Sequence, residues 1–112
     1  MSAQRHRITR PDPFVDPIVE WTPHAIDRWE ERGDDRGHLR AYVESQEIDY
    51  PSAHSGCRGR YHAESDVVLI VARERRLEAS IGWEIFDVVV TVIELTDREE
   101  DEQEFVRQQV SE

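Results

Sequence analysis

Apolar residues recur at helical spacing in two segments of the N-terminal half. The first segment has one apolar stripe, formed by Ala25, Ile26 and Trp29. Thr22 suits the N-cap, Pro23 suits the first helical position, where a missing N–H costs nothing, and Gly33 suits the left-handed residue that ends helices. The pattern predicts a short helix whose two ends are marked by the sequence itself.

The second segment, residues 35–45, repeats the helical spacing at Leu39, Tyr42 and Val43, with Asp34 or Asp35 as the candidate cap. A very short turn at Gly33 separates it from the first segment. We therefore expect the two helices to form a hairpin.

From residue 47 onward the pattern is typical of strands, with β-branched residues, continuous apolar runs and alternation. The predicted strands cover residues 48–51, 58–63, 67–73 and 86–95. Residues 14–21 fit a short extended piece. Residues 74–84 stay ambiguous, because Leu77, Ile81 and Trp83 fit either an extra strand or an elaborated loop.

These elements predict an α+β fold, with an N-terminal two-helix hairpin packed on one face of an antiparallel sheet of about four strands. We expect residues 1–13 to be a flexible N-terminal arm and residues 14–96 to be a single domain. Residues 97–112 are expected to be an acidic appendage with a possible short C-terminal helix. The other face of the sheet would be left for chemistry or for a partner.

Composition leads to an expectation about the salt concentration in which the protein works. The 112 residues carry a formal charge of -11, from 25 acidic side chains against 14 basic ones, and all 14 bases are arginine. An acidic surface without lysine and with 38% hydrophobic residues is what we expect of a salt-adapted protein, because dense salt screens the repulsion among carboxylates. The alternative is an acidic mimic of nucleic acid that occupies a basic cleft of another protein.

Cysteine usage and hydropathy restrict the cellular location and the kinds of metal site that we expect. Cys57 is the only cysteine, which excludes an intramolecular disulfide and a four-cysteine zinc site. His54, Cys57 and His62 lie in one segment, but their spacing fits no zinc motif, so we expect neither a metal nor a cofactor. The longest apolar run, residues 67–72, is too short to cross a bilayer. We expect a cytoplasmic protein that does not contact a membrane.

The candidate catalytic residues are mainly histidines and arginines. His24 and Arg28 lie one turn apart at the edge of the first helix. On an alternating strand Arg58, Arg60 and His62 point to the same side. Imidazole can exchange protons near neutral pH and guanidinium binds phosphate in a bidentate manner, so the combination fits RNA cleavage.

Each candidate also has a structural interpretation. His24 can belong to a capping network, and Arg28 can pair with a neighbouring carboxylate. Residues 58–62 can be an ordinary solvated strand face, and Thr91 can be a good strand former. Tyr50, Tyr61 and Trp83 either stack on bases or are buried in the core.

The segment from Thr22 to Gly33 contains His-Ala, then Arg, then Glu-Arg-Gly. This pattern resembles the opening helix of the small RelE/ParE-like toxins and of related domains in the barnase/RelE nuclease superfamily, from about residue 20 to 95. In that family a second helix and an antiparallel sheet follow. The chain departs from the ribosome-dependent members, which are generally basic and lysine-rich.

The resemblance implies roles for five residues. His24 would be general base or acid, His62 the complementary acid or base, Arg28 and Arg60 would stabilise the phosphate, and Thr91 would position a phosphate oxygen. The implied function is a toxin-type or housekeeping endoribonuclease that needs no metal, with RNA as substrate and a protein antitoxin as a possible partner. The alternative is a non-catalytic interaction domain of the same fold, for example in a mobile element or virus, that binds a protein or nucleic acid.

Overall fold

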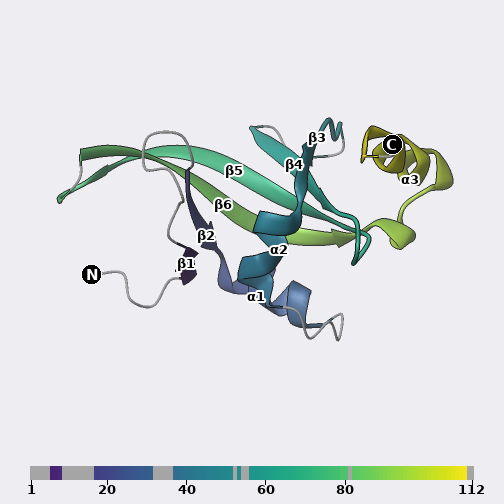
Figure 1. Ribbon diagram of the computed structural model, residues 1–112, viewed down its shortest axis with the longest axis horizontal. Coiled ribbons are helices and arrows are strands. Elements are labelled where there is room, and N and C mark those ends of the chain that lie inside the picture. Colours follow the sequence, from purple (N-terminus) through teal and green to yellow (C-terminus); the bar gives the residue numbers. More distant parts are fainter. Residues whose placement is uncertain are drawn as a thin grey trace.

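The computed structural model describes residues 6–8, 17–31, 37–51, 53, 56–80 and 82–110. Over these residues the chain is a mixed α+β fold with six strands in one sheet, three α-helices and one 3-10 turn (Figure 1). The strands are β1 (His6–Ile8), β2 (Ile18–Trp21), β3 (Gln46–Ile48), β4 (Cys57–His62), β5 (Val67–Glu78) and β6 (Gly82–Glu94). The helices are α1 (Pro23–Glu30), α2 (His38–Glu44) and α3 (Glu100–Val110), with the 3-10 turn η1 (Leu95–Asp97) before α3.

The sheet has the strand order β1-β2-β6-β5-β4-β3. All neighbouring pairs are antiparallel except β2 and β6, which run parallel, with Trp21 opposite Val89. The long β5–β6 hairpin is the centre of the sheet, and Figure 1 shows it extending well past the helices.

The predicted N-terminal helical hairpin and four-stranded sheet are wrong, although the α+β class is right. Two strands, β1 and β2, precede α1, and β2 lies inside the sheet between β1 and β6. The ambiguous segment 74–84 lengthens β5 and β6 and adds no separate strand. Strands of three or four residues carry too little periodicity for the sequence to place them in a sheet.

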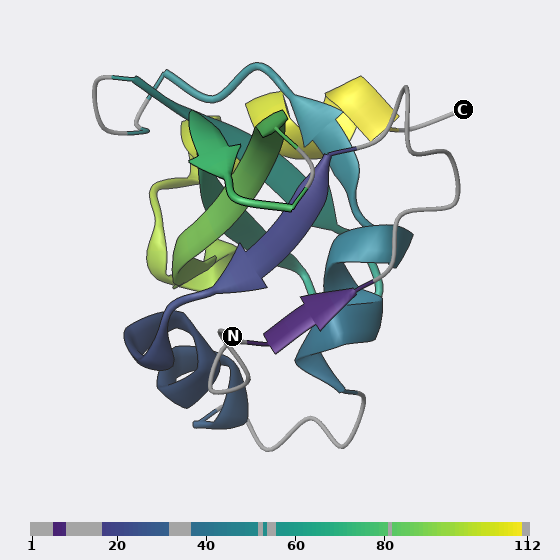
Figure 2. The same cartoon turned by 90° about the vertical axis from the view of Figure 1, so that its left-hand side faces the viewer.

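Two cores lie on opposite faces of the sheet (Figure 2). The first joins α1 and α2 to the sheet, through Val19, Trp21, Ala25, Trp29, Ala41, Tyr42, Val67, Leu69, Val71, Val89 and Val92. The second joins the last turn and α3 to the sheet, through Ile48, Tyr50, Tyr61, Val68, Ile70, Leu95 and Val106. The expectation of a sheet with one open face is therefore wrong in this region, because α3 covers the second face.

Two tyrosines fix α3 in place. The Tyr50 hydroxyl donates to Glu102 on α3, and the Tyr61 hydroxyl donates to Asp66. Arg107 on α3 donates to the same Asp66 carboxylate, and Asp66 adopts the left-handed conformation, with φ 58°, in the turn between β4 and β5. The acidic C-terminal segment thus meets the sheet through Val106 and these polar contacts. The domain boundaries remain predictions, and residues 1–5 and 9–13 of the expected arm lie outside the described residues.

The contribution of α3 can be measured with two neighbouring substitutions. Val106 is fully buried, whereas Phe105 is 42% exposed. We expect Val106→Ser to lower the free energy of unfolding by about 2 kcal/mol or more, because it removes apolar contacts and buries a hydroxyl. The matched Phe105→Ser should cost less than about 1 kcal/mol. Equal losses in chemical denaturation would contradict the packing of α3 on the sheet.

Candidate functional site

Thr22 attaches the start of α1 to β6. Its Oγ1 accepts a hydrogen bond from the Ala25 N–H at 3.1 Å, which caps the helix, and donates to the Val90 carbonyl at 3.2 Å. Its own N–H donates to the Val89 carbonyl at 3.1 Å. Pro23 occupies the first turn, where an N–H is dispensable. The helix therefore begins at a fixed point beside β6, which positions the next residue, His24.

His24 and Thr91 meet at this point. The His24 Nε2 lies 3.2 Å from the Thr91 Oγ1, and the imidazole is exposed to solvent. A β-bulge contributes to this meeting: Val71 pairs with Val89 but Ile70 pairs with Thr91, so Val90 is the extra residue. A bulge reverses the facing of the residues beyond it, which places Thr91 on the side of Ile70 instead of the side of Val89.

Arg28 lies one turn after His24, also on the surface. Its guanidinium is 3.3 Å from the Glu31 carboxylate, and both side chains are exposed, so the pair contributes little to stability. A shallow cleft of about 210 Å³ lies beside it, lined by Arg28, Glu31, Val92, Glu94 and Asp97. One cation and three carboxylates therefore border this cleft beside Arg28.

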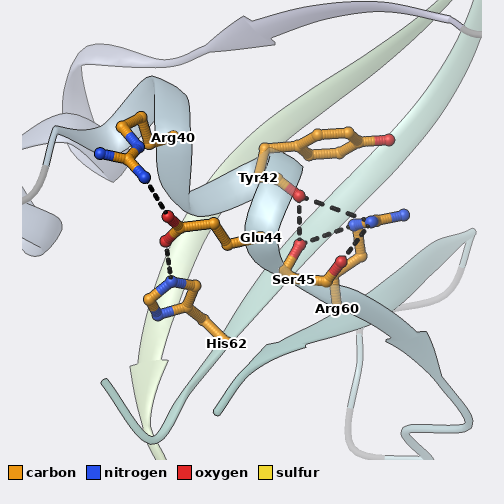
Figure 3. Close-up of polar contacts among 6 residues, drawn as sticks. All are labelled: Arg40, Tyr42, Glu44, Ser45, Arg60 and His62. Carbon is orange, nitrogen blue, oxygen red and sulfur yellow. Dashed lines mark hydrogen bonds and ion pairs between the residues drawn. The ribbon is translucent and has the colours of Figure 1, made fainter. Parts of the chain in front are cut away.

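Arg60 has a different environment. It lies over the Tyr42 ring, with its guanidinium carbon 4.2 Å from the ring centroid. Its Nε donates to the Ser45 Oγ at 2.8 Å, and a terminal nitrogen donates to the Ser45 carbonyl at 2.7 Å and to the Tyr42 carbonyl at 3.4 Å (Figure 3). Carbonyls at a helix C-terminus lack intrahelical partners. Arg60 satisfies those at the end of α2.

His62 is buried, with 1% of its surface exposed. Its Nε2 lies 2.8 Å from a Glu44 carboxylate oxygen, and the other oxygen of that carboxylate accepts from Arg40 at 2.8 Å (Figure 3). The Trp29 ring packs edge-on against the imidazole at 5.6 Å. The Nδ1 is buried and has no hydrogen-bond partner within the described chain.

The alternation of the β4 side chains is as predicted, but the side they share is not an open one. Arg60 and His62 pair in register with Leu69 and Val67, two residues of the core beneath α1 and α2. Arg58 lies farther out and pairs with Glu47 at 3.0 Å. The structure thus brings together His24 and Thr91, with Arg28 one turn away, and places Arg60 and His62 in a separate cluster under α2.

An ion pair with a buried carboxylate, which the sequence analysis missed, lies next to Arg60. Asp87 accepts from the Tyr42 hydroxyl at 2.6 Å and from two nitrogens of Arg73 at 2.8 and 3.0 Å. Burial alone would raise the pKa of Asp87, but the hydrogen bonds from Arg73 and Tyr42 outweigh burial and hold this pKa below its usual value. Burial and the bond to Asp87 raise the pKa of Tyr42. The only feature of the sequence that could have indicated this ion pair is the position of Asp87 within an apolar strand.

Three potential metal ligands gather in the cluster under α2. Glu44, His62 and Glu64 offer ligand atoms that all lie within 4.8 Å of one another. Arg40 and His62 contact the two oxygens of the Glu44 carboxylate, so these side chains form a polar network around Glu44. His54, from the segment considered for zinc, lies outside the described residues.

Comparison with known protein families identifies the family to which the domain belongs. Residues 19–96, more than half of the chain, match the Halo_toxin family, whose description reads "Putative RelE superfamily toxin domain". The chain belongs to this family. The match runs from β2 into the 3-10 turn η1. It therefore includes all five candidate site residues, His24, Arg28, Arg60, His62 and Thr91.

No curated protein and no solved structure matches the chain. Within the described residues, none of the helices of this RelE superfamily domain has the length and apolar character needed to cross a membrane.

Substituting the two arginines of β4 one at a time tests their different roles. Arg60→Ala should lower the free energy of unfolding by about 1–3 kcal/mol, because carbonyls at the end of α2 lose a charged donor. Arg58→Ala, which removes only an exposed pair, should change it by less than about 1 kcal/mol. Thermal and urea unfolding of both variants measure the difference. Equal stability of Arg60→Ala and the unsubstituted domain would contradict the structural role.

Proposed function

We propose that this RelE superfamily toxin domain is a metal-independent endoribonuclease whose reactive centre is the surface around His24. The observation that carries the proposal is the contact between an exposed imidazole and the Thr91 hydroxyl, one helical turn from Arg28. Membership of a RelE superfamily toxin family supports a toxin-type function.

The chemistry assigned to this surface needs only side chains. Cleavage that leaves a cyclic phosphate forms a bond from the 2′-oxygen to phosphorus and breaks the bond from phosphorus to the 5′-oxygen. An imidazole suits removal of the proton from the 2′-hydroxyl, and solvent water at this exposed surface can protonate the leaving 5′-oxygen. A hydroxyl at hydrogen-bond distance restricts the orientation of the ring, as Thr91 does for His24. Arg28 is the nearby cation that can stabilise charge developing on the phosphate, once the weak pair with Glu31 opens.

Arg60 and His62 have a smaller part in this proposal than the sequence assigned to them. Both are engaged with α2, so a direct contact with RNA would require that helix to move. We propose that they support the domain and that His24, Thr91 and Arg28 carry the reaction.

The carboxylates of the cleft impose a condition on RNA binding. Glu31, Glu94 and Asp97 border the cleft and repel a polyanion at low ionic strength. The screening length falls from about 10 Å at 0.1 M salt to about 3 Å at 1 M. We therefore propose a salt-adapted cytoplasmic enzyme whose RNA cleavage is measurable in molar salt.

RNA cleavage by matched variants tests the assignment. The substrate is a single-stranded oligoribonucleotide of mixed sequence, in about 1 M KCl with a chelator present. We expect His24→Ala to reduce the rate by about 100-fold or more, the range of general acid–base catalysis. Glu30→Ala, an exposed change on the same helix, should leave the rate unchanged. The all-deoxy analogue should resist cleavage, because it lacks the attacking hydroxyl.

Three results would contradict this assignment. Equal cleavage by His24→Ala would exclude the imidazole, and loss of activity with the chelator would exclude a metal-independent reaction. Absence of cleavage by the unsubstituted domain in low and high salt would favour the alternative, a non-catalytic interaction domain. The three carboxylates in the cleft are the observation that speaks for that alternative.

The salt adaptation has its own test. Raising KCl from dilute buffer to about 1 M should raise the midpoint of thermal unfolding, because salt screens repulsion among the 25 acidic side chains. Sucrose, which acts through exclusion from the protein surface and leaves charges unscreened, should give a smaller increase. An unfolding midpoint that is the same in dilute buffer and in molar KCl would contradict salt adaptation.

A further inference from the structure

The far end of the β5–β6 hairpin forms a two-stranded ribbon outside the rest of the sheet. Pairing of β4 with β5 ends at Ala72, and pairing of β2 with β6 covers Phe86 to Val89. Among the described residues, 73–78 therefore pair only with 82–87. Residues 82–85 of β6 likewise have β5 as their only neighbouring strand. Figure 1 shows the ribbon reaching to the left of the helices, and Figure 2 shows its tip facing the viewer.

The two faces of the ribbon differ in chemistry. Cross-strand partners share a face, and the register pairs Arg75 with Ile85 and Leu77 with Trp83. These four residues make up what we call the tryptophan face. The opposite face carries Glu74, Arg76, Glu78 and Glu84.

The tryptophan face exposes three large apolar side chains. Leu77 is 66% exposed, Trp83 is 61% exposed and Ile85 is 43% exposed. They account for three of the five large hydrophobic side chains that are exposed in the described chain, the others being Val43 and Phe105. Isolated apolar residues on a surface are ordinary, but a group of them on one projecting element marks an interaction site.

Arg75 gives this face its charge. Its guanidinium lies over the Trp83 ring, 5.2 Å from the centroid, and it forms no ion pair with another described residue. The neighbouring arginines are engaged, Arg73 by Asp87 and Arg76 by Glu20 and Glu74. The nearest carboxylate on this side, that of Asp87, is buried. In a chain with a charge of -11, the tryptophan face is thus apolar and locally positive.

We propose that the tryptophan face docks a segment of a partner protein that presents apolar side chains flanked by carboxylates. Trp and Arg are the residues most enriched among those that dominate protein–protein binding energy, and here they are stacked beside two aliphatic side chains. Charge complementarity to Arg75 selects an acidic partner. The inference involves none of the residues around His24, and it holds whether or not the domain cleaves RNA.

Two other occupants fit less well. RNA would gain one stacking ring, but the aliphatic side chains of Leu77 and Ile85 offer nothing that phosphates bind, and among the described residues of this face Arg75 is the one cation outside an ion pair. A second copy of this chain would bring two Arg75 side chains, which are like charges, into the contact. Both are distinguishable from the proposed partner in one experiment.

The test uses the three tryptophans as reporters in ¹⁵N-labelled full-length domain. The probe is a synthetic amphipathic peptide with leucines along one helical face and glutamates beside them; its control has lysine in place of glutamate. We expect the glutamate peptide to shift the indole N–H resonance of Trp83 and to leave those of the buried Trp21 and Trp29 in place. Leu77→Ser and Arg75→Glu should each weaken binding at least tenfold, whereas Glu84→Gln on the opposite face should change it less than twofold.

The outcomes separate the occupants. No shift with either peptide, or equal binding of the lysine peptide, overturns the proposal. A larger shift with oligouridylate than with the glutamate peptide would assign the face to RNA. A Trp83 resonance that moves on dilution without any peptide would assign it to a second copy. Unchanged unfolding midpoints of Leu77→Ser and Arg75→Glu, two exposed positions, show that lost binding is not lost folding.

Discussion

The attachment of α1 to β6 through Thr22 is the constraint on which the candidate site depends. The Thr22 hydroxyl caps the helix and donates to the Val90 carbonyl of β6, and the Thr22 N–H donates to the preceding carbonyl of that strand, that of Val89. The parallel pairing of β2 with β6 brings Thr22 to this position. His24, two residues later, therefore comes within hydrogen-bond distance of Thr91 without a long loop to order.

Helices cover both faces of the central part of the sheet, and this determines what the polar residues there do. On the first face α2 needs partners for its last carbonyls, and Arg60 supplies them. His62 is enclosed between Trp29 and Glu44. On the second face α3 places Val106 against the sheet while most of its acidic side chains remain at the surface. Arg60 and His62 of β4 are thus engaged by α2. The exposed candidate groups are those around His24 and those on the β5–β6 ribbon.

Much of the local structure could be predicted from the sequence. Thr22 and Pro23 mark the start of α1 as expected, and the continuous apolar run from Val67 marks a central strand. The toxin family was indicated by the pattern of the α1 segment and is shown by the match over residues 19–96. These features are local, so that a few neighbouring residues determine them.

Long-range features were not predictable in the same way. Four residues of β2 contain no signal for a parallel partner more than sixty positions away. The bulge at Val90 reverses the facing of Thr91, and strict alternation cannot reveal it. Alternation gave the common side of Arg60 and His62 correctly, but only the docking of α2 decides that this side is covered. In segment 74–84 Leu77 and Trp83 lie on an exposed face, so burial could not explain them.

The most direct measurement of the central claim is the nuclear Overhauser effect between the His24 ring and the Thr91 methyl group in the folded domain in molar KCl. The account predicts a cross-peak between them, which a Thr22→Val substitution weakens by removing the hydroxyl that caps α1 and bonds to β6. A His24 ring that shows cross-peaks only to its own helix would contradict the account, because the imidazole would then lie away from β6 and from the surface assigned to catalysis.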